Sequence, residues 1–134
     1  MKTVNYNLLE ALLYPLAGEA DDDDMTNKFL SLDIYDDNQI KEVIKNYFYQ
    51  DFINQSLIFQ SQCEISLAYY LITEKISFTR IIQSSLLPFD PSPLGKKWFL
   101  LMWEIYFGDK SYNSFNISDY IEIDDPDEVM RLLR

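Results

Sequence analysis

The side chains in this sequence that could do chemistry are carboxylates. The chain has 22 Asp and Glu among 134 residues and no histidine, so the commonest general base and metal ligand are absent. Two carboxylates in a cleft can carry out glycosidase-type chemistry when one has a raised pKa. Glu104 is the candidate, because it lies in the apolar run of residues 98–107. We favour the simpler interpretation, that Glu104 pairs with a cation or faces water.

Other catalytic and ligand-binding patterns are missing. The sequence has no phosphate-binding GxxxxGK[ST] or GxGxxG loop, and it has neither a CxxC nor an HExxH motif. Four consecutive aspartates at residues 21–24 lack the central Gly and distal Glu of a Ca²⁺ loop, which leaves only weak divalent binding open. Cys63, the single cysteine, is expected to be a small buried hydrophobe. We therefore predict a non-enzymatic protein with no cofactor and no metal site.

The acidic residues are concentrated in two segments. Residues 1–37 hold nine Asp and Glu against two Lys, and residues 109–128 hold seven against one Lys. The centre, residues 38–108, holds six residues of each sign, and the net charge of the chain is −11. If the two segments share one face, their field attracts a basic partner and steers its approach. The predicted contact residues are Asp21, Asp22, Asp23, Asp24, Asp33, Asp36, Asp37, Asp119, Glu122, Asp124, Asp125, Asp127 and Glu128.

The same composition excludes other partners and compartments. A net charge of −11 is repelled by nucleic-acid phosphates and by anionic membrane surfaces, so neither is an expected partner. The longest uncharged stretch is too short and polar to span a bilayer. The first 20 residues lack the basic region and cleavage site of a signal peptide, and one cysteine allows no internal disulfide. We expect a cytoplasmic protein.

Apolar spacing predicts a helical fold. Apolar residues recur at helical intervals, or fill long stretches without a breaker, at about residues 8–14, 37–53, 57–74, 78–87 and 94–107. Asp125-Pro126 signals a further helix start, and Asp36 with Gln39 has the spacing of a capping box. We predict a single all-α domain over residues 1–134 with about five helices. The alternative is an α+β fold in which alternating stretches at residues 29–35 and 117–123 pair as a small sheet. The aspartate run at 21–24 is expected to be a solvated loop.

One segment resembles a known family. In residues 40–52 a helix ends in Tyr47-Phe48, and Gln50, Asp51 and another aromatic follow after Tyr49. This resembles the Tyr-Phe-His-Gln-Asp-Trp segment of small acidic immunity proteins from contact-dependent growth inhibition systems, with Tyr49 in place of the His. The resemblance implies a protein that binds the toxin of its own system and blocks the toxin's active site or substrate surface. Such toxins are often basic nucleases.

Four functions are compatible with these observations. The first is an immunity protein that covers a basic bacterial toxin domain with an acidic face. The second is a DNA-mimicking inhibitor, which needs carboxylates spaced like phosphates along an extended surface. The third is an enzyme that uses Glu104, and the fourth is an interaction subunit whose acidity only maintains solubility. We favour the first and keep the DNA mimic as the alternative.

Overall fold

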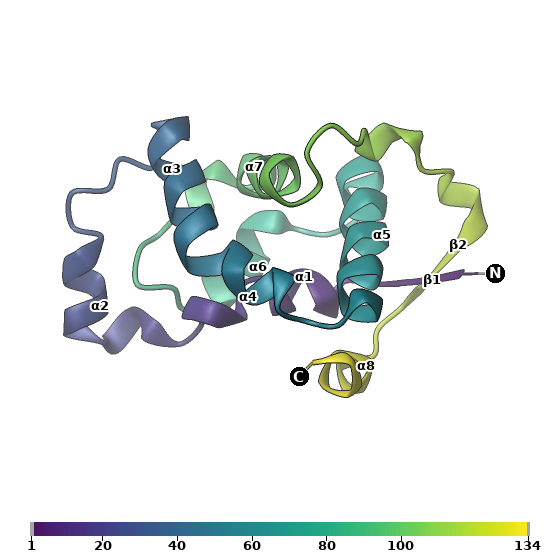
Figure 1. Cartoon of the computed structure of the whole chain (residues 1–134), viewed down its shortest axis with the longest axis horizontal. Coiled ribbons are helices and arrows are strands. Elements are labelled where there is room, and N and C mark those ends of the chain that lie inside the picture. The colour runs from purple at the N-terminus through teal and green to yellow at the C-terminus, as the bar shows by residue number, and fades with distance from the viewer. Residues whose placement is uncertain (1, 134) are drawn as a thin grey trace.

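The computed structural model describes residues 2–133, and most of them are helical (Figure 1). Within that range there are eight α-helices and two short strands. The helices are α1 (Asn7–Ala11), α2 (Asp23–Lys28), α3 (Asp37–Ile44), α4 (Gln50–Ile53), α5 (Leu57–Thr73), α6 (Phe78–Ser84), α7 (Lys96–Phe107) and α8 (Pro126–Leu132). The strands are β1 (Lys2–Asn5) and β2 (Tyr120–Ile123). Short 3₁₀ turns are η1 (Tyr14–Leu16), η2 (Glu19–Asp21), η4 (Ser92–Leu94), η5 (Tyr112–Ser114) and η6 (Ile117–Asp119), and η3 (Lys45–Tyr49) is a π-helix.

This architecture corrects the prediction of an all-α domain with about five helices. The helical character is confirmed, but short α2 and a small parallel sheet are added to the predicted set. In the sheet, β1 pairs with β2 so that Lys2 lies opposite Tyr120 and Asn5 opposite Ile123. The prediction of a sheet containing residues 117–123 is therefore right in part, because β2 falls within them. Their partner is the first strand of the chain, not residues 29–35.

Residues 29–35 form turns instead of a strand. Phe29 is buried, and its ring lies 5.1 Å from that of Tyr47 and 4.8 Å from that of Phe89. Leu32 and Ile34 are partly buried against the core, but Leu30 is 78 % exposed, so only part of the alternating pattern corresponds to an inner face. Phe29, Leu32 and Ile34 hold this segment against the core, and within residues 2–133 no strand pairs with its backbone.

The helix predicted over residues 37–53 is confirmed, but it contains a π-turn. Elements α3, η3 and α4 follow one another without a break from Asp37 to Ile53. Every fourth residue on its inner side is buried, namely Ile40, Ile44, Phe48 and Phe52. In a helix of 3.6 residues per turn, each step of four residues drifts by about 40° around the axis. The wider i→i+5 turn of η3 offsets that drift and keeps Phe48 and Phe52 facing the core.

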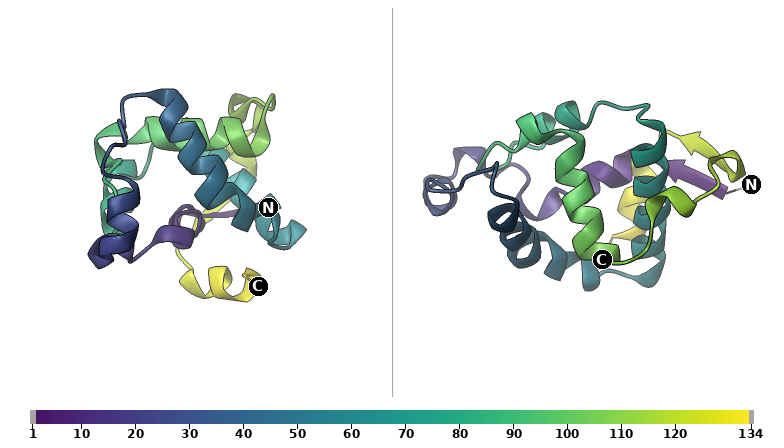
Figure 2. Two further views of the ribbon diagram at one scale, coloured as in Figure 1. Left: turned by 60° about the vertical axis from the view of Figure 1, so that its left-hand side comes forward. Right: turned by 90° about the horizontal axis from the view of Figure 1, so that it is seen from above.

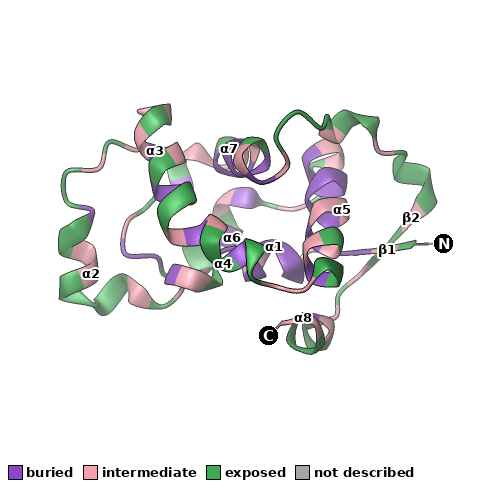
Figure 3. Ribbon diagram, in the orientation of Figure 1, coloured by how far each residue is buried: buried purple, intermediate pink, exposed green. Residues whose placement is uncertain are grey.

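The core lies between this long helix, α5, α7 and α1 (Figure 3). Three α7 side chains, Trp98, Phe99 and Met102, are fully buried, so this helix lies at the centre of the core. Each contributes about 1.5–3 kcal/mol of hydrophobic stabilisation. Glu104 lies on the wet side of α7, where its carboxylate is 2.9 Å from the Lys41 ammonium. That ion pair matches the simpler of the two interpretations of Glu104.

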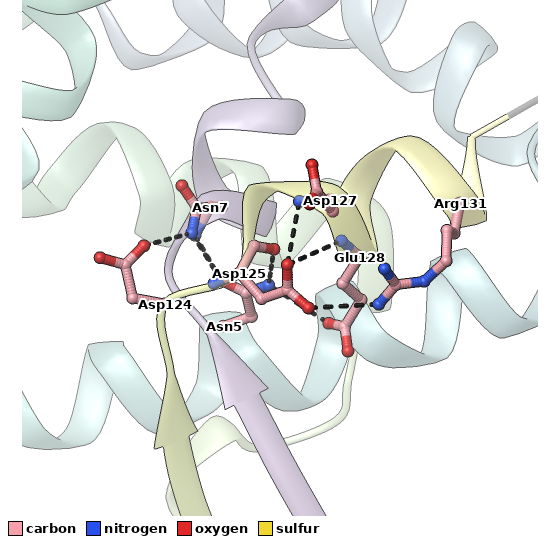
Figure 4. A network of polar contacts seen from close by, with 7 residues as sticks. All are labelled: Asn5, Asn7, Asp124, Asp125, Asp127, Glu128 and Arg131. Carbon is pink, nitrogen blue, oxygen red and sulfur yellow. Dashed lines mark hydrogen bonds and ion pairs between the residues drawn. The ribbon is translucent and has the colours of Figure 1, made fainter.

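The two ends of the chain are joined by a polar network around Asn5 (Figure 4). The Asn5 side chain is fully buried and donates to the backbone carbonyl of Asp125 (2.7 Å) and to Glu128 Oε1 (3.3 Å). Its Oδ1 accepts from the backbone N–H (3.1 Å) and the side-chain amide (2.8 Å) of Asn7. The Asn5 backbone N–H donates to Ser66 Oγ on α5 (3.0 Å). One side chain thus ties β1 and α1 to the start of α8.

We predict that Asn5→Ala lowers the free energy of unfolding by about 2–4 kcal/mol, because it leaves several buried polar groups without partners. Urea unfolding followed by circular dichroism measures this loss. The control is Asn27→Ala, which truncates an exposed Asn on α2 and should change stability by less than about 0.5 kcal/mol. Equal, small losses in the two variants would show that the network does not hold the ends together.

Candidate functional site

The two acidic segments do not form one continuous face. In Figure 1, α2 lies at one end of the long axis and β2 at the other, and the additional views in Figure 2 keep them apart. A single basic surface that contacts all thirteen predicted carboxylates would have to span the length of the molecule. The roles of the individual carboxylates therefore decide which segment is available to a partner.

Most carboxylates of the C-terminal segment are used inside the protein. Asp125 caps α8 by accepting from the backbone N–H groups of Asp127 and Glu128, and it pairs with Arg131 at 3.2 Å. This pairing with Arg131 lowers the pKa of the Asp125 carboxyl group. Asp124 accepts from the Asn7 side chain at 2.9 Å, Glu128 accepts from Asn5, and Glu122 pairs with Lys75 at 3.1 Å. Asp119 and Asp127 are exposed, and within residues 2–133 their carboxylates make no hydrogen bond or ion pair.

Three acids that precede or begin α3 also have structural roles. Asp36 caps the helix by accepting from the backbone N–H groups of Asn38 (3.0 Å) and Gln39 (3.4 Å). The Gln39 side chain returns to the Asp36 carboxylate at 3.2 Å, so the predicted capping pair forms between side chains. Asp37 lies 2.7 Å from the Lys97 ammonium, and Asp33 accepts from the backbone N–H of Tyr35 at 3.0 Å. These contacts stabilise the entry to α3.

The aspartate run at 21–24 is not the loop that its composition predicts. Asp21 ends η2, Asp22 caps α2 by accepting from the Met25 backbone N–H at 3.1 Å, and Asp23 and Asp24 form the first helical turn. Negative side chains are favourable there because the N-terminal end of a helix carries partial positive charge. All four are exposed (green on α2 in Figure 3). We call these four residues the acidic end.

The cations of the protein do not compensate the acidic end. Within residues 2–133 there are seven ion pairs, and every one of them uses an acid at position 37 or later. Lys41, Lys45 and Lys96 pair with acids of their own central region, whereas Lys75 pairs with Glu122 and Lys97 with Asp37. The carboxylates of Asp21, Asp23 and Asp24 have no ion-pair or hydrogen-bond partner in the described chain. The strongest unneutralised charge therefore lies on η2 and the start of α2.

A carboxylate of the first acidic segment, Glu10, interacts electrostatically with Asp124 of the second. Burial, and then the charge of Asp124, raise the pKa of the Glu10 carboxyl group. Burial and a hydrogen bond from the Tyr6 hydroxyl to Asp124 raise the pKa of Tyr6 in the same way. At neutral pH the Glu10 and Asp124 carboxylates therefore repel each other, whereas the hydrogen bond from the neutral Tyr6 hydroxyl to Asp124 is favourable.

An aromatic cavity opens on the side of the molecule where the long helix meets the C-terminal residues. It has a volume of about 240 Å³. We call it the aromatic cavity. Its lining residues are Ala11, Leu12, Tyr14, Pro15, Phe48, Asp51, Phe52, Gln55, Phe59, Tyr106 and Leu133. Phe52 stacks on Tyr106 with ring centroids 4.4 Å apart. Three of the lining residues belong to the segment whose sequence resembles the immunity proteins, Phe48, Asp51 and Phe52.

Within residues 2–133, two polar groups of the aromatic cavity, the Asp51 carboxylate and the Tyr106 hydroxyl, have no hydrogen-bond or ion-pair partner. Asp51 is exposed and forms no ion pair with any described residue. The hydroxyl of Tyr106 is buried and makes no hydrogen bond, and burial raises its pKa well above the ordinary value. Tyr106, Phe59, Tyr14 and Leu133 come from distant parts of the sequence. Sequence spacing could not predict this cavity, because nothing in the local pattern around those residues indicates that they meet.

Other candidate chemistry is not assembled. No group of three His, Cys, Asp or Glu side chains within residues 2–133 could hold a metal ion. Cys63 is fully buried, as predicted, and burial raises the pKa of its thiol. Among the same residues, no helix has both the length and the apolar composition needed to cross a bilayer.

Comparisons with known proteins gave no relative. No family model matches the chain, and neither the curated proteins nor the solved structures contain a significant match.

We predict that Glu10→Gln stabilises the protein at pH 7 by about 0.5 kcal/mol, because it removes a charge that burial and Asp124 disfavour. The pKa of Glu10 is raised in the folded state, so its negative charge lowers the free energy of unfolding at high pH. This destabilisation disappears as the pH falls through that pKa. Thermal unfolding at pH 7 and pH 4 measures the effect, and the gain should vanish at the lower pH. Glu42→Gln is the exposed control. A gain that is equal at both pH values would contradict this assignment.

Proposed function

We propose that this protein is an immunity protein that binds a basic bacterial toxin domain and neutralises it without catalysing a reaction. The observation that carries the proposal is the uncompensated charge of the acidic end. Four exposed aspartates lie at one extremity of the molecule, and no cation of the described chain pairs with them. Such a patch raises the local concentration of a basic partner and accelerates its association.

The segment at residues 40–52 supports the same proposal. It resembles immunity proteins of contact-dependent growth inhibition systems, and in the structure it forms the long helix from α3 to α4 together with part of the aromatic cavity. The packing of Phe48 and Phe52 explains two of its aromatic residues structurally. Asp51 is not explained by packing, because it is exposed and unpaired. Its position next to the cavity is consistent with contact to a partner.

The identity of the partner can be tested by affinity capture of the tagged protein from its own host, followed by elution in a salt gradient. We expect one basic polypeptide, held in a stoichiometric complex and released only at high salt or in denaturant. Expression of that polypeptide alone should stop bacterial growth, and co-expression of this protein should restore growth. Capture of a nucleic-acid-handling protein whose binding competes with duplex DNA would support a DNA mimic instead. Growth arrest that this protein does not relieve would refute the immunity function.

Neutralising the acidic end should slow association with the captured partner. We predict that the triple variant Asp21→Asn, Asp23→Asn, Asp24→Asn lowers the association rate constant about ten-fold at low ionic strength and flattens its salt dependence. Asp22 is kept because it caps α2. Stopped-flow or surface-based kinetics at several salt concentrations measures both quantities.

The comparison variant removes three charges from the opposite end, by Asp109→Asn, Asp119→Asn and Asp127→Asn. These residues are also exposed, and within the described chain their carboxylates have no partner. We expect the association rate constant to fall less than three-fold. The reverse ranking of the two variants would move the contact to the β2–α8 end. Equal, negligible effects would mean that long-range attraction plays no part in binding.

A further inference from the structure

The size of the aromatic cavity matches a single side chain. Sites for drug-sized ligands and cofactors have volumes of about 300–1,000 Å³. At about 240 Å³ the cavity is smaller than these sites. A long side chain from a partner protein could fill it, whereas a nucleotide or flavin could not.

The walls of the cavity favour a flat cationic group. Phe52 stacks on Tyr106, and the Phe59 ring lies 6.3 Å from that of Phe52, so aromatic surface is offered from α4, α5 and α7. The faces of aromatic rings attract cations, and a planar guanidinium also stacks on them. The aliphatic residues Leu12 and Leu133 add apolar surface that suits a methylene stem.

The charge of the cavity has one sign. Asp51 is the only carboxylate among the described lining residues, and none of them is a Lys or an Arg. Since Asp51 forms no ion pair within the described chain, an incoming cation would not have to displace an internal partner. Tyr106 also lines the cavity, and its buried hydroxyl oxygen has no hydrogen-bond partner within residues 2–133. A buried hydroxyl without a partner costs stability, and a donor from another molecule would satisfy it.

Exposed apolar side chains follow directly after the cavity residues on α4 and at the start of α5. Ile53 is 41 %, Leu57 80 % and Ile58 64 % exposed, although all three are large hydrophobic residues. An apolar patch of this kind beside a pocket is typical of the centre of a protein interface and not of a small-molecule site. The occupant therefore belongs to a protein.

We propose that the aromatic cavity binds one arginine side chain of the protein partner. The guanidinium pairs with the Asp51 carboxylate and donates to the Tyr106 hydroxyl, and the methylene stem packs on Phe52 and Phe59. This inference rests on the proposed function in one respect, that the partner is a basic protein. The acidic end then accelerates the approach, and the cavity supplies a short-range anchor of the kind that dominates interface energies.

The test uses the whole ¹⁵N-labelled protein and two small probes, N-acetyl-arginine methylamide and its citrulline analogue, which has the same shape without the charge. We expect amide shifts concentrated at residues 51–55, with a dissociation constant in the millimolar range for the arginine probe. The citrulline probe should bind at least five-fold more weakly. Asp51→Asn should weaken arginine binding five- to ten-fold, since it removes a charge-assisted hydrogen bond. Asp109→Asn, which removes one charge elsewhere, should leave it unchanged.

Tyr106→Phe separates a binding role from a structural one. Removal of a buried hydroxyl that has no partner should raise Tm by a few degrees, while arginine binding becomes two- to three-fold weaker. A purely structural hydroxyl would change Tm without changing the binding of the probe.

Equal binding of the two probes would overturn the proposal, as would shifts concentrated at residues 21–24 or the absence of shifts at tens of millimolar. The titration contains no toxin, so its failure leaves the growth-rescue result standing. Failure of growth rescue with a successful titration would refute the immunity function and leave the ligand class of the cavity intact.

Discussion

The buried Asn5 side chain is the constraint on which the arrangement of this protein depends. It holds β1 against the start of α8, across 120 residues of sequence, and its own backbone N–H is fixed by Ser66 on α5. Each donor and acceptor of the side chain has a partner, so the two ends of the chain are held in one register. The same contacts support the parallel pairing of β1 with β2, because two strands of only four residues each are weakly stable by themselves.

The contacts around Asn5 also decide which carboxylates contribute free negative charge to the surface. Asp124, Asp125 and Glu128 are drawn into hydrogen bonds around Asn5, Asn7 and Arg131, so they act as structural groups. Five of the six cations in residues 38–108 form ion pairs, and none of these pairs involves the acidic end. The remaining surface charge is unevenly distributed. One end of the molecule carries four exposed aspartates, and the charge of the opposite end is partly neutralised. The electrostatic polarity thus follows from how the core and the termini are tied together.

The π-turn links the core to the proposed anchor cavity. By offsetting the helical drift, it keeps Phe48 and Phe52 on the core side and leaves Asp51 exposed at the edge of the aromatic cavity. Apolar residues of η1, α5, α7 and the C-terminal segment complete the walls. In the proposed complex, the acidic end would supply long-range attraction and the cavity short-range selectivity, and the two come from different parts of the sequence.

Local sequence determined most helices of this protein. Caps at Asp36, Ser77 and Asp125 and the C-terminal Gly108 act within one or two turns, so local sequence predicted helices at about 37–53, 57–74, 78–87 and 94–107 and a helix start at Asp125. The structure ends α6 earlier than predicted, at Ser84, and Leu86 then adopts a positive φ. The β1–β2 pairing, the turn structure of residues 29–35, the internal use of Asp124 and the aromatic cavity required the tertiary structure. Each of these depends on partners that are far apart in the sequence, and local residue patterns carry no information about which distant groups meet.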